Sequence, residues 1–267
     1  MLGRGIAGPA ATRFGFDASW AAIEQAARNA FGEAGLDPAV CQDVHAGVGV
    51  AGLSRAGARL ALEAKPHPFA SVRFVTDGEI ACLGAHAGRD GAIVIVGTGS
   101  CGIGLFEERM LKVGGYGFPV SDEGSGAALG LAAMRLALLA HDGRTDRTAL
   151  LDELMRCFSN EPNEIVGWMD KATATDYAAF APIIVRHAEV GDAAARRIMQ
   201  TGASAIEGIC RRLFERGAPR LSLIGGLASV MEAWLAPDLR RRLSPAEGDA
   251  LDGAAILARR GLAGRSS

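Results

Sequence analysis

The chain has few of the features that mark metal-binding, secreted or membrane proteins. Its five cysteines stand far apart without a Cys-x-x-Cys pair, so the sequence indicates neither a zinc site nor a disulfide framework. The five histidines have no metal-ligand spacing either. There is no start of the signal-peptide kind and no run of about 18 apolar residues. These absences predict a soluble protein of the reducing cytoplasm.

An excess of charge of one sign is also absent. The formal net charge is −2, and the sequence pI is about 6.2. Only three residues are lysines, and the arginines are scattered rather than clustered. Because nothing attracts the chain as a whole to a polyanion, we expect neither nucleic acid nor a membrane as a partner.

What the chain does have is enough apolar surface for a packed interior. It holds 267 residues, of which 49% are hydrophobic, so it can form one large domain or two small ones.

Strands and helices alternate in the first third of the chain, which predicts parallel strands. The hydrophobic spacing predicts helices over 17–35, 54–65 and 79–87, and strands over 44–52 and 72–75.

The pattern of predicted strands and helices changes after Asp90, where we expect a domain boundary. A buried strand over 93–96 is followed by a predicted hairpin, 103–106 with 110–113. Helices then dominate, at 125–140, 148–158, 176–190 and 192–215. A last strand, 220–224, ends in Gly225-Gly226, and a closing helix is predicted over 252–262.

Two glycine-framed segments carry the clearest chemistry. The strand ending at Val96 runs into Gly97-Thr98-Gly99-Ser100, which exposes backbone N–H groups and two hydroxyls, as phosphate binding requires. The second segment, 114–126, places a carboxylate, Asp122, beside an aromatic, Tyr116. That pairing suits a sugar ring and its hydroxyls.

Three glycine-marked strand ends are expected to converge. They are Asp77-Gly78, Gly97–Ser100 and Gly225-Gly226. Sheets of α/β proteins gather ligands at such carboxyl ends, so the sequence predicts one binding region there.

With these motifs the chain resembles the amino-sugar kinases of the actin-like ATPase superfamily. These are the N-acetylglucosamine and glucosamine kinases, related to the activator ATPases of the BadF/BadG/BcrA/BcrD type. The resemblance runs from Gly3–Pro9 to Gly253–Leu257. It implies a two-lobed α/β fold of the ribonuclease H-like type: an N-terminal lobe over 1–90, joined by the helix at 250–265, and a helix-rich C-terminal lobe over 91–249.

The resemblance also implies an activity, the ATP- and Mg²⁺-dependent phosphorylation of glucosamine or N-acetylglucosamine at the 6-hydroxyl. A homodimer is implied as well. Asp77 is similar to the catalytic carboxylate that accepts the proton of the sugar hydroxyl. The implied sugar-binding residues are Ser100, Cys101, Tyr116, Gly117 and Asp122. The implied nucleotide-binding residues are Gly97, Thr98, Gly99, Gly225 and Gly226.

Several of these positions have a plainer structural interpretation. Asp77 can be a helix N-cap, and Asp122 can cap the helix that follows Ser125. The Gly97–Ser100 segment can be a tight entry into a hairpin, and Gly225-Gly226 a turn between strand and helix.

The chain departs from the family pattern at its start and near the sugar. The strand, Asp-Gly-Gly-Gly-Thr turn and second strand that hold phosphates and Mg²⁺ in these kinases are missing, which implies a truncated N-terminal lobe. We expect either a start upstream of Met1 or a shortened form with weakened kinase activity. Ala10-Ala11-Thr12 and Cys101 stand where relatives have asparagines, so the sugar itself stays open.

Three other functions compete with a sugar kinase. The string Gly97–Gly102 fits the G-x-G-x-x-G dinucleotide fingerprint, although a predicted hairpin follows it where that fingerprint needs a helix. An activator ATPase for an acyl-CoA dehydratase would need cysteines for an iron–sulfur cluster. A sugar sensor without turnover is the third.

Overall fold

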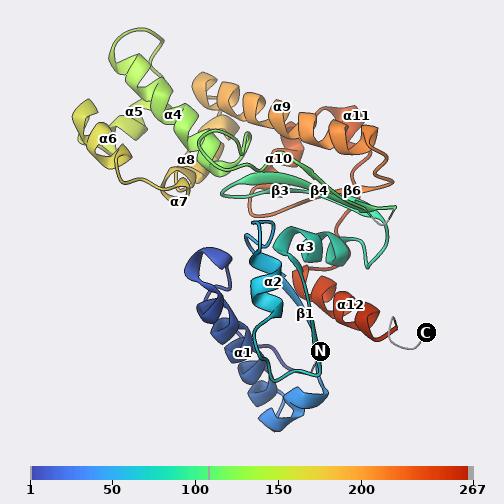
Figure 1. Ribbon diagram of the computed structural model, residues 1–267. Helices are drawn as coiled ribbons and strands as arrows, with labels where there is room; N and C mark the ends of the chain where they lie inside the picture. The colour runs from blue at the N-terminus through green and yellow to red at the C-terminus, as the bar shows by residue number, and fades with distance from the viewer. Residues whose placement is uncertain (1, 108, 264–267) are drawn as a thin grey trace. The chain divides into compact units, whose positions relative to one another are not determined.

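The computed structural model describes residues 2–107 and 109–263 (Figure 1). The chain forms two compact units. The first unit contains the residues up to Arg89 together with those from Ala246 onward, and the second unit is the continuous stretch Asp90–Pro245. Both ends of the chain therefore belong to the first unit.

The first unit is a small parallel sheet with helices on both faces. Strands β1 (His45–Val50) and β2 (Ser71–Thr76) pair in parallel, with Val50 opposite Thr76, which confirms the parallel pairing predicted from the alternating pattern. Its helical segments are η1 (Thr12–Phe14), α1 (Phe16–Glu33), η2 (Pro38–Asp43), α2 (Ala58–Glu63), α3 (Asp77–Ala85) and α12 (Ala250–Ala263).

The period of two in β1 assigns its residues to the two faces of the sheet. Ala46, Val48 and Val50 pack into an apolar cluster around the buried Trp20 of α1. The indole Nε1 of Trp20 donates a hydrogen bond of 3.0 Å to the carbonyl oxygen of Leu62, so the one polar atom of this side chain is satisfied.

Glycines on the opposite face let helices α3 and α12 come close to the sheet and to each other. A Cβ at Gly47 of β1 would collide with the carbonyl oxygen of Ala254 in α12. A Cβ at Gly84 of α3 would collide with Asp249, and one at Gly253 of α12 would collide with Ile80. Backbone thus packs on backbone, which no larger residue would allow.

The second unit is built on a four-stranded sheet in the order β5-β4-β3-β6. Strand β3 (Gly91–Val96) pairs antiparallel with β4 (Ser100–Phe106) and parallel with β6 (Leu221–Ile224). Strand β5 (Arg109–Val113) is the antiparallel partner of β4, which confirms the predicted hairpin.

Eight helices of the second unit lie within the described residues (Figure 1). They are α4 (Gly126–His141), α5 (Ala149–Arg156), α6 (Pro162–Met169), α7 (Ala174–Ala178), α8 (Ala181–Glu189), α9 (Ala193–Glu215), α10 (Ala228–Trp234) and α11 (Pro237–Arg240). The long helix α9 covers the sheet, because a Cβ at Gly102 of β4 would meet Ile209 at 2.6 Å and Leu213 at 3.0 Å.

The single helix predicted over 176–190 is wrong, because the structure has two helices there. Helix α7 ends at Ala178, and α8 begins with Pro182 in its first turn. A proline ring fits the first turn of a helix but not its interior, so it separates the two helices. Prolines also open α6 and α11, which the hydrophobic spacing did not predict.

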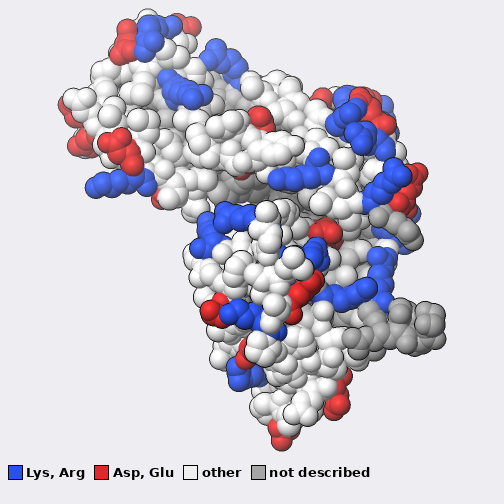
Figure 2. Space-filling view, viewed as in Figure 1, with Lys and Arg blue, Asp and Glu red and all other residues white. Residues whose placement is uncertain are grey.

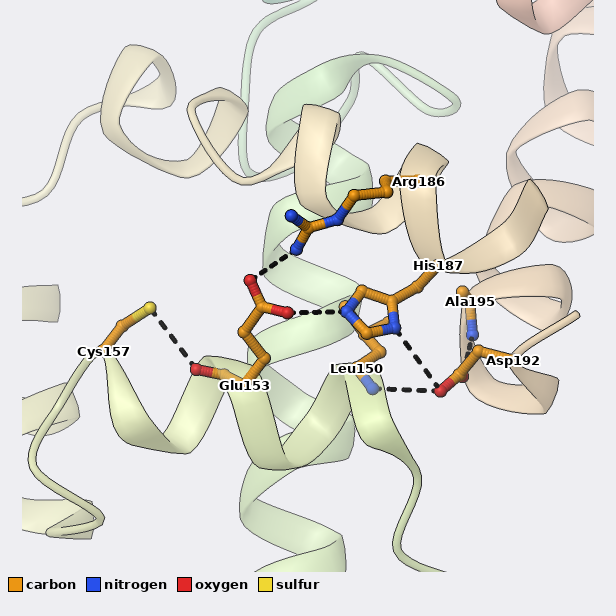
Figure 3. Close-up of polar contacts among 7 residues, drawn as sticks. All are labelled: Leu150, Glu153, Cys157, Arg186, His187, Asp192 and Ala195. Atoms are coloured by element: carbon orange, nitrogen blue, oxygen red, sulfur yellow. Dashed lines mark hydrogen bonds and ion pairs between the residues drawn. The ribbon is translucent and has the colours of Figure 1, made fainter. Parts of the chain in front are cut away.

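A polar cluster ties three helices of the second unit together (Figure 3). Glu153 of α5 accepts a hydrogen bond of 2.5 Å from Arg186, and its Oε2 lies 2.7 Å from Nε2 of His187, both on α8. Asp192 caps α9 by accepting from the amide of Ala195 at 3.0 Å, and it also accepts from the amide of Leu150 in α5 at 2.9 Å.

The surface is of mixed charge, as the balanced composition predicts. On the face shown in Figure 2, acidic and basic side chains lie in small alternating groups between neutral areas. In the part of the chain that the structure describes, every helix is too short or too polar to traverse a lipid bilayer.

Candidate functional site

Three segments of the second unit meet where strand β3 ends. The carbonyl oxygen of Gly97 accepts a hydrogen bond of 2.8 Å from the amide of Gly126, at the start of α4. The carbonyl oxygen of Val96 accepts one of 3.0 Å from the amide of Leu227, just before α10. The turn after β3, the start of α4 and the turn after β6 therefore form one cluster, as the sequence predicted for these two glycine-marked ends.

The Gly97–Gly99 segment is the hairpin turn between β3 and β4, which confirms the plainer interpretation without removing the functional one. The amide of Gly97 donates to the carbonyl oxygen of Gly99 at 2.9 Å. Within residues 2–107 and 109–263, the amides of Thr98 and Gly99 donate to no acceptor. A Cβ at Gly97 would meet no atom within 4 Å. The turn thus offers free donors and open space to an anion.

The two glycines after β6 differ in their surroundings. Gly225 has a φ of +106°, and a Cβ there would lie 2.5 Å from the carbonyl oxygen of Val96. Gly226 has no atom within 4 Å of its Cβ position. Gly225 is therefore required by the packing of the turn, whereas the absent side chain of Gly226 leaves a space at the surface of this turn.

Asp122 lies between the Gly97–Gly99 turn and the loop of Gly117. Its Oδ1 accepts a hydrogen bond of 3.2 Å from the amide of Gly117, and a Cβ on Gly99 would lie 2.7 Å from its Oδ2. The interpretation of Asp122 as the cap of α4 is wrong. The cap is Ser125, whose Oγ accepts from the amide of Ala128 at 3.2 Å.

The other residues predicted to contact a sugar differ in exposure. Tyr116 is 80% exposed, and Gly117 is exposed beside it. Ser100 is only 3% exposed, and its Oγ donates to the carbonyl oxygen of Glu123 at 2.7 Å. Cys101 is half-buried under the loop, since a Cβ on Gly115 would lie 2.6 Å from its Sγ. Ser100 and Cys101 thus support the loop that carries Tyr116.

Asp77 belongs to the first unit, where it is the first residue of α3 and follows β2 directly. Its interpretation as an N-cap is wrong, because Thr76 and Glu79 form the capping box. The amide of Glu79 donates to Oγ1 of Thr76 at 3.1 Å, and the amide of Thr76 donates to Oε2 of Glu79 at 2.8 Å. The Asp77 carboxylate is exposed and accepts no hydrogen bond from any described residue.

Lys112 is one residue of this region that sequence reasoning did not select. It lies on β5, and its ammonium group contacts both the backbone and the ring of the Tyr116 loop. The signal in the sequence is its place two residues before Gly114-Gly115, in a chain with only three lysines.

A family model matches almost the whole chain. The model of the BadF/BadG/BcrA/BcrD ATPase family matches residues 1–256. The chain belongs to this family.

Two of the most similar relatives are described as amino-sugar kinases. A glucosamine kinase of Vibrio cholerae serotype O1 is 37% identical over 257 residues, which cover 96% of this chain and 87% of the relative. The crystal structure of a candidate N-acetylglucosamine kinase of Chromobacterium violaceum matches with a TM-score of 0.88 and 31% identity, over 96% of this chain and 90% of that one.

More distant structures share the fold. A hexokinase of the ROK type from Thermus thermophilus matches with a TM-score of 0.53 and 19% identity, over 93% of this chain and 88% of its own. These matches confirm the actin-like ATPase fold expected from the sequence.

The dinucleotide fingerprint is excluded by the local structure. Gly102 lies inside β4, so a strand follows the Gly97–Gly102 string directly. That fingerprint holds its pyrophosphate at the N-terminus of an immediately following helix, which this segment does not have.

Proposed function

We propose that this protein transfers the γ-phosphoryl group of ATP to a hydroxyl of an amino sugar, glucosamine or N-acetylglucosamine. The observation that carries the proposal is the cluster at the end of β3, where two glycine turns and the start of α4 are held together by backbone hydrogen bonds. Family membership and relatives described as amino-sugar kinases support the same reaction.

The glycine turns are the proposed nucleotide site. Free amides at Thr98 and Gly99 suit phosphate oxygens, and these donors need no charged side chain. The space beside Gly226 suits a flat group that approaches the backbone closely. Gly97 and Gly225 also belong to the proposed nucleotide site. Gly97 leaves open space beside the turn after β3, and Gly225 allows the tight turn after β6.

The loop from Gly114 to Asp122 is the proposed sugar site. An exposed tyrosine ring can stack on the C–H groups of a pyranose, and a carboxylate accepts hydrogen bonds from its hydroxyls. Tyr116, Gly117 and Asp122 have these roles in the proposal. Ser100 and Cys101 belong to the proposed sugar site as residues that support this loop from beneath. The sugar hydroxyl proposed to accept the phosphoryl group is the 6-hydroxyl.

Asp77 is the proposed catalytic base. A neutral alcohol is a poor nucleophile, so a carboxylate that takes its proton raises the rate of phosphoryl transfer. No described residue donates a hydrogen bond to the exposed carboxylate of Asp77, so it is available for that proton.

Magnesium is proposed to arrive with the nucleotide. The described residues contain no group of three or more His, Cys, Asp or Glu side chains that could hold a metal ion. Mg²⁺ in phosphoryl-transfer enzymes keeps several waters and is held largely by the phosphates, where it neutralises their charge. This chain's contribution is therefore the backbone donors of the glycine turns.

A coupled assay of ADP release over a panel of sugars tests the function. Glucosamine or N-acetylglucosamine should give saturable ADP release, and glucose should give less. Hydrolysis of ATP that no sugar accelerates would contradict the proposal and favour an activator ATPase. Sugar binding by calorimetry without ADP release would favour a sensor.

Replacing Asp77 with Asn tests the base. The D77N variant should lose about two to four orders of magnitude in kcat, because an amide cannot take the proton, with little change in sugar affinity. Asp43→Asn is a matched control, since Asp43 is an exposed aspartate of the same unit. Unchanged kcat in D77N would remove Asp77 from the mechanism.

A further inference from the structure

Lys112 is an exposed residue on β5, the edge strand of the second unit, paired across the ladder with Ile103. Its Nζ donates a hydrogen bond of 2.6 Å to the carbonyl oxygen of Gly115. The same ammonium group lies 5.0 Å from the centre of the Tyr116 ring. One side chain thus holds both the backbone of the turn and the ring that follows it.

The turn needs such support because its own backbone restricts it weakly. Gly114, Gly115 and Gly117 have φ values of +67°, +68° and +108°, which glycine adopts easily. Glycine can also change to other backbone conformations readily, since it has no side chain to limit rotation about its φ and ψ bonds. Tyr116 sits among them with 80% of its surface exposed, so little packing fixes its ring.

Other hydrogen bonds of the loop hold its backbone or join two of its side chains, and none of those named here reaches the Tyr116 ring. The amide of Tyr116 donates to Oγ of Ser121 at 3.3 Å, and the amide of Gly117 donates to Asp122 at 3.2 Å. The Ser121 hydroxyl in turn donates to Glu123 at 3.3 Å. Among the described residues, Lys112 provides the cation–π contact to the ring itself.

We propose that Lys112 is a positioning residue for the sugar site: it holds one face of the Tyr116 ring so that the other face is presented to the amino sugar. This inference rests on the proposed function, since it requires that the loop binds the sugar. A cation attracts the face of an aromatic ring, and the opposite face stays free to stack on sugar C–H groups.

Kinetics of single variants test the role. Lys112→Met keeps the length of the side chain but removes the charge and the donor. The sugar KM should rise about three- to tenfold, with kcat and the KM for ATP nearly unchanged, as expected when a binding contact is lost. Lys112→Arg should restore the sugar KM, because a guanidinium keeps both contacts.

Lys171→Met is the matched control, because Lys171 is an exposed lysine of the same unit at the end of α6. It should leave all three constants unchanged. An unchanged sugar KM in K112M, or an equal rise in K171M, would overturn the inference.

A double-variant cycle shows whether Lys112 acts through Tyr116. Tyr116→Leu should raise the sugar KM, and adding Lys112→Met to it should produce no further rise. If the rises in sugar KM of the two single variants multiply in the double variant, Lys112 does not act through Tyr116. If the sugar KM of Y116L is unchanged, the ring does not face the sugar. Either result overturns the inference.

A spectroscopic test does not depend on turnover. Reductive ¹³C-methylation keeps the charge of lysine and labels only Lys65, Lys112, Lys171 and the α-amino group. The NMR signal that disappears in Lys112→Arg is that of Lys112. The Lys112 signal should be shifted by the Tyr116 ring and should lose that shift in Tyr116→Leu. If no sugar is phosphorylated but the shift is present, the proposed function fails and the contact stands. A signal that Tyr116→Leu does not move overturns the contact itself.

Discussion

The adjacent glycines Gly225 and Gly226 separate two reasons for a residue to lack a side chain. A Cβ at Gly225 would press on the carbonyl oxygen of Val96 at 2.5 Å, in a residue with a φ of +106°. A Cβ at Gly226 would touch nothing within 4 Å. The first glycine is needed by the fold, and the second is free to serve a ligand.

Alanine at each position should therefore have a different effect. Gly225→Ala should lower the free energy of unfolding by about 1–3 kcal/mol, the usual cost of a strained backbone conformation. Gly226→Ala should leave that free energy nearly unchanged but raise the KM for ATP roughly tenfold, which corresponds to about 1.4 kcal/mol of binding. Urea unfolding and ATP titration of the two variants check this contrast. Equal stability losses would contradict it.

At the scale of elements, the cluster around Glu153 makes the packing of α5, α8 and α9 sensitive to acid. Hydrogen bonds from His187 and then Arg186 lower the pKa of Glu153. Burial would raise the pKa of Asp192, but the hydrogen bonds from the amides of Leu150 and Ala195 outweigh it and the pKa is lowered. Both carboxylates therefore bind protons more weakly in the folded chain than in the unfolded chain.

The direction of the pH effect follows from this difference. Where the unfolded state binds more protons, stability rises with pH, so these carboxylates contribute fully above the ordinary carboxyl pKa of about 4. Their contribution is lost as the pH falls through the lowered folded values. Urea unfolding at a series of pH values between about 5 and 3 measures this loss. The free energy of unfolding should fall less steeply with decreasing pH in Glu153→Gln than in the original chain.

Glu164→Gln is the control for that series. Glu164 is an exposed glutamate of the neighbouring helix α6. Its variant should follow the pH dependence of the original chain. If the free energy of unfolding falls as steeply with decreasing pH in E153Q as in E164Q, the cluster does not make the packing of these helices depend on pH.

Most elements were predictable because their signals are local. The valines of β1 alternate with glycines, and the structure uses that alternation to separate the Trp20 core from helices α3 and α12. The break at Pro182 and the short helices α6 and α11 were not predicted. Helices of four to eight residues show little periodicity, and their ends are set by proline and by packing.

The candidate site was predictable to a different degree. The glycine turns could be found because strand ends followed by glycine have a direct physical meaning. Capping could not be assigned correctly, since Thr76, Asp77 and Glu79 are all suitable near a helix start, and only the geometry selects Thr76. Lys112 was overlooked because its role depends on a contact across a turn, which spacing does not reveal. The role of Asp77 came from family resemblance, and that of Asp122 from its place beside Tyr116 together with the resemblance; both roles stay predictions.

At the scale of the whole molecule, the first unit depends on both ends of the chain. The chain leaves it at Arg89 and returns at Ala246, so helix α12 must pack against α3 and β1 after the second unit has been traversed. That packing relies on Gly253, whose Cβ position is occupied by the backbone of Ile80 in α3.

Gly253→Ala should therefore loosen the first unit and leave the second intact. The added methyl group must push α12 away from α3, at a cost of about 1–3 kcal/mol for an overpacked core. Hydrogen exchange of peptides should be faster across residues 2–89 and unchanged across α4 and α9. Gly208→Ala on α9 is the control, because its Cβ would meet nothing within 4 Å, and alanine favours a helix by about 1 kcal/mol. Faster exchange in both regions of G253A would mean that the two units do not unfold independently, because loss of the α12 contact would then weaken the second unit as well.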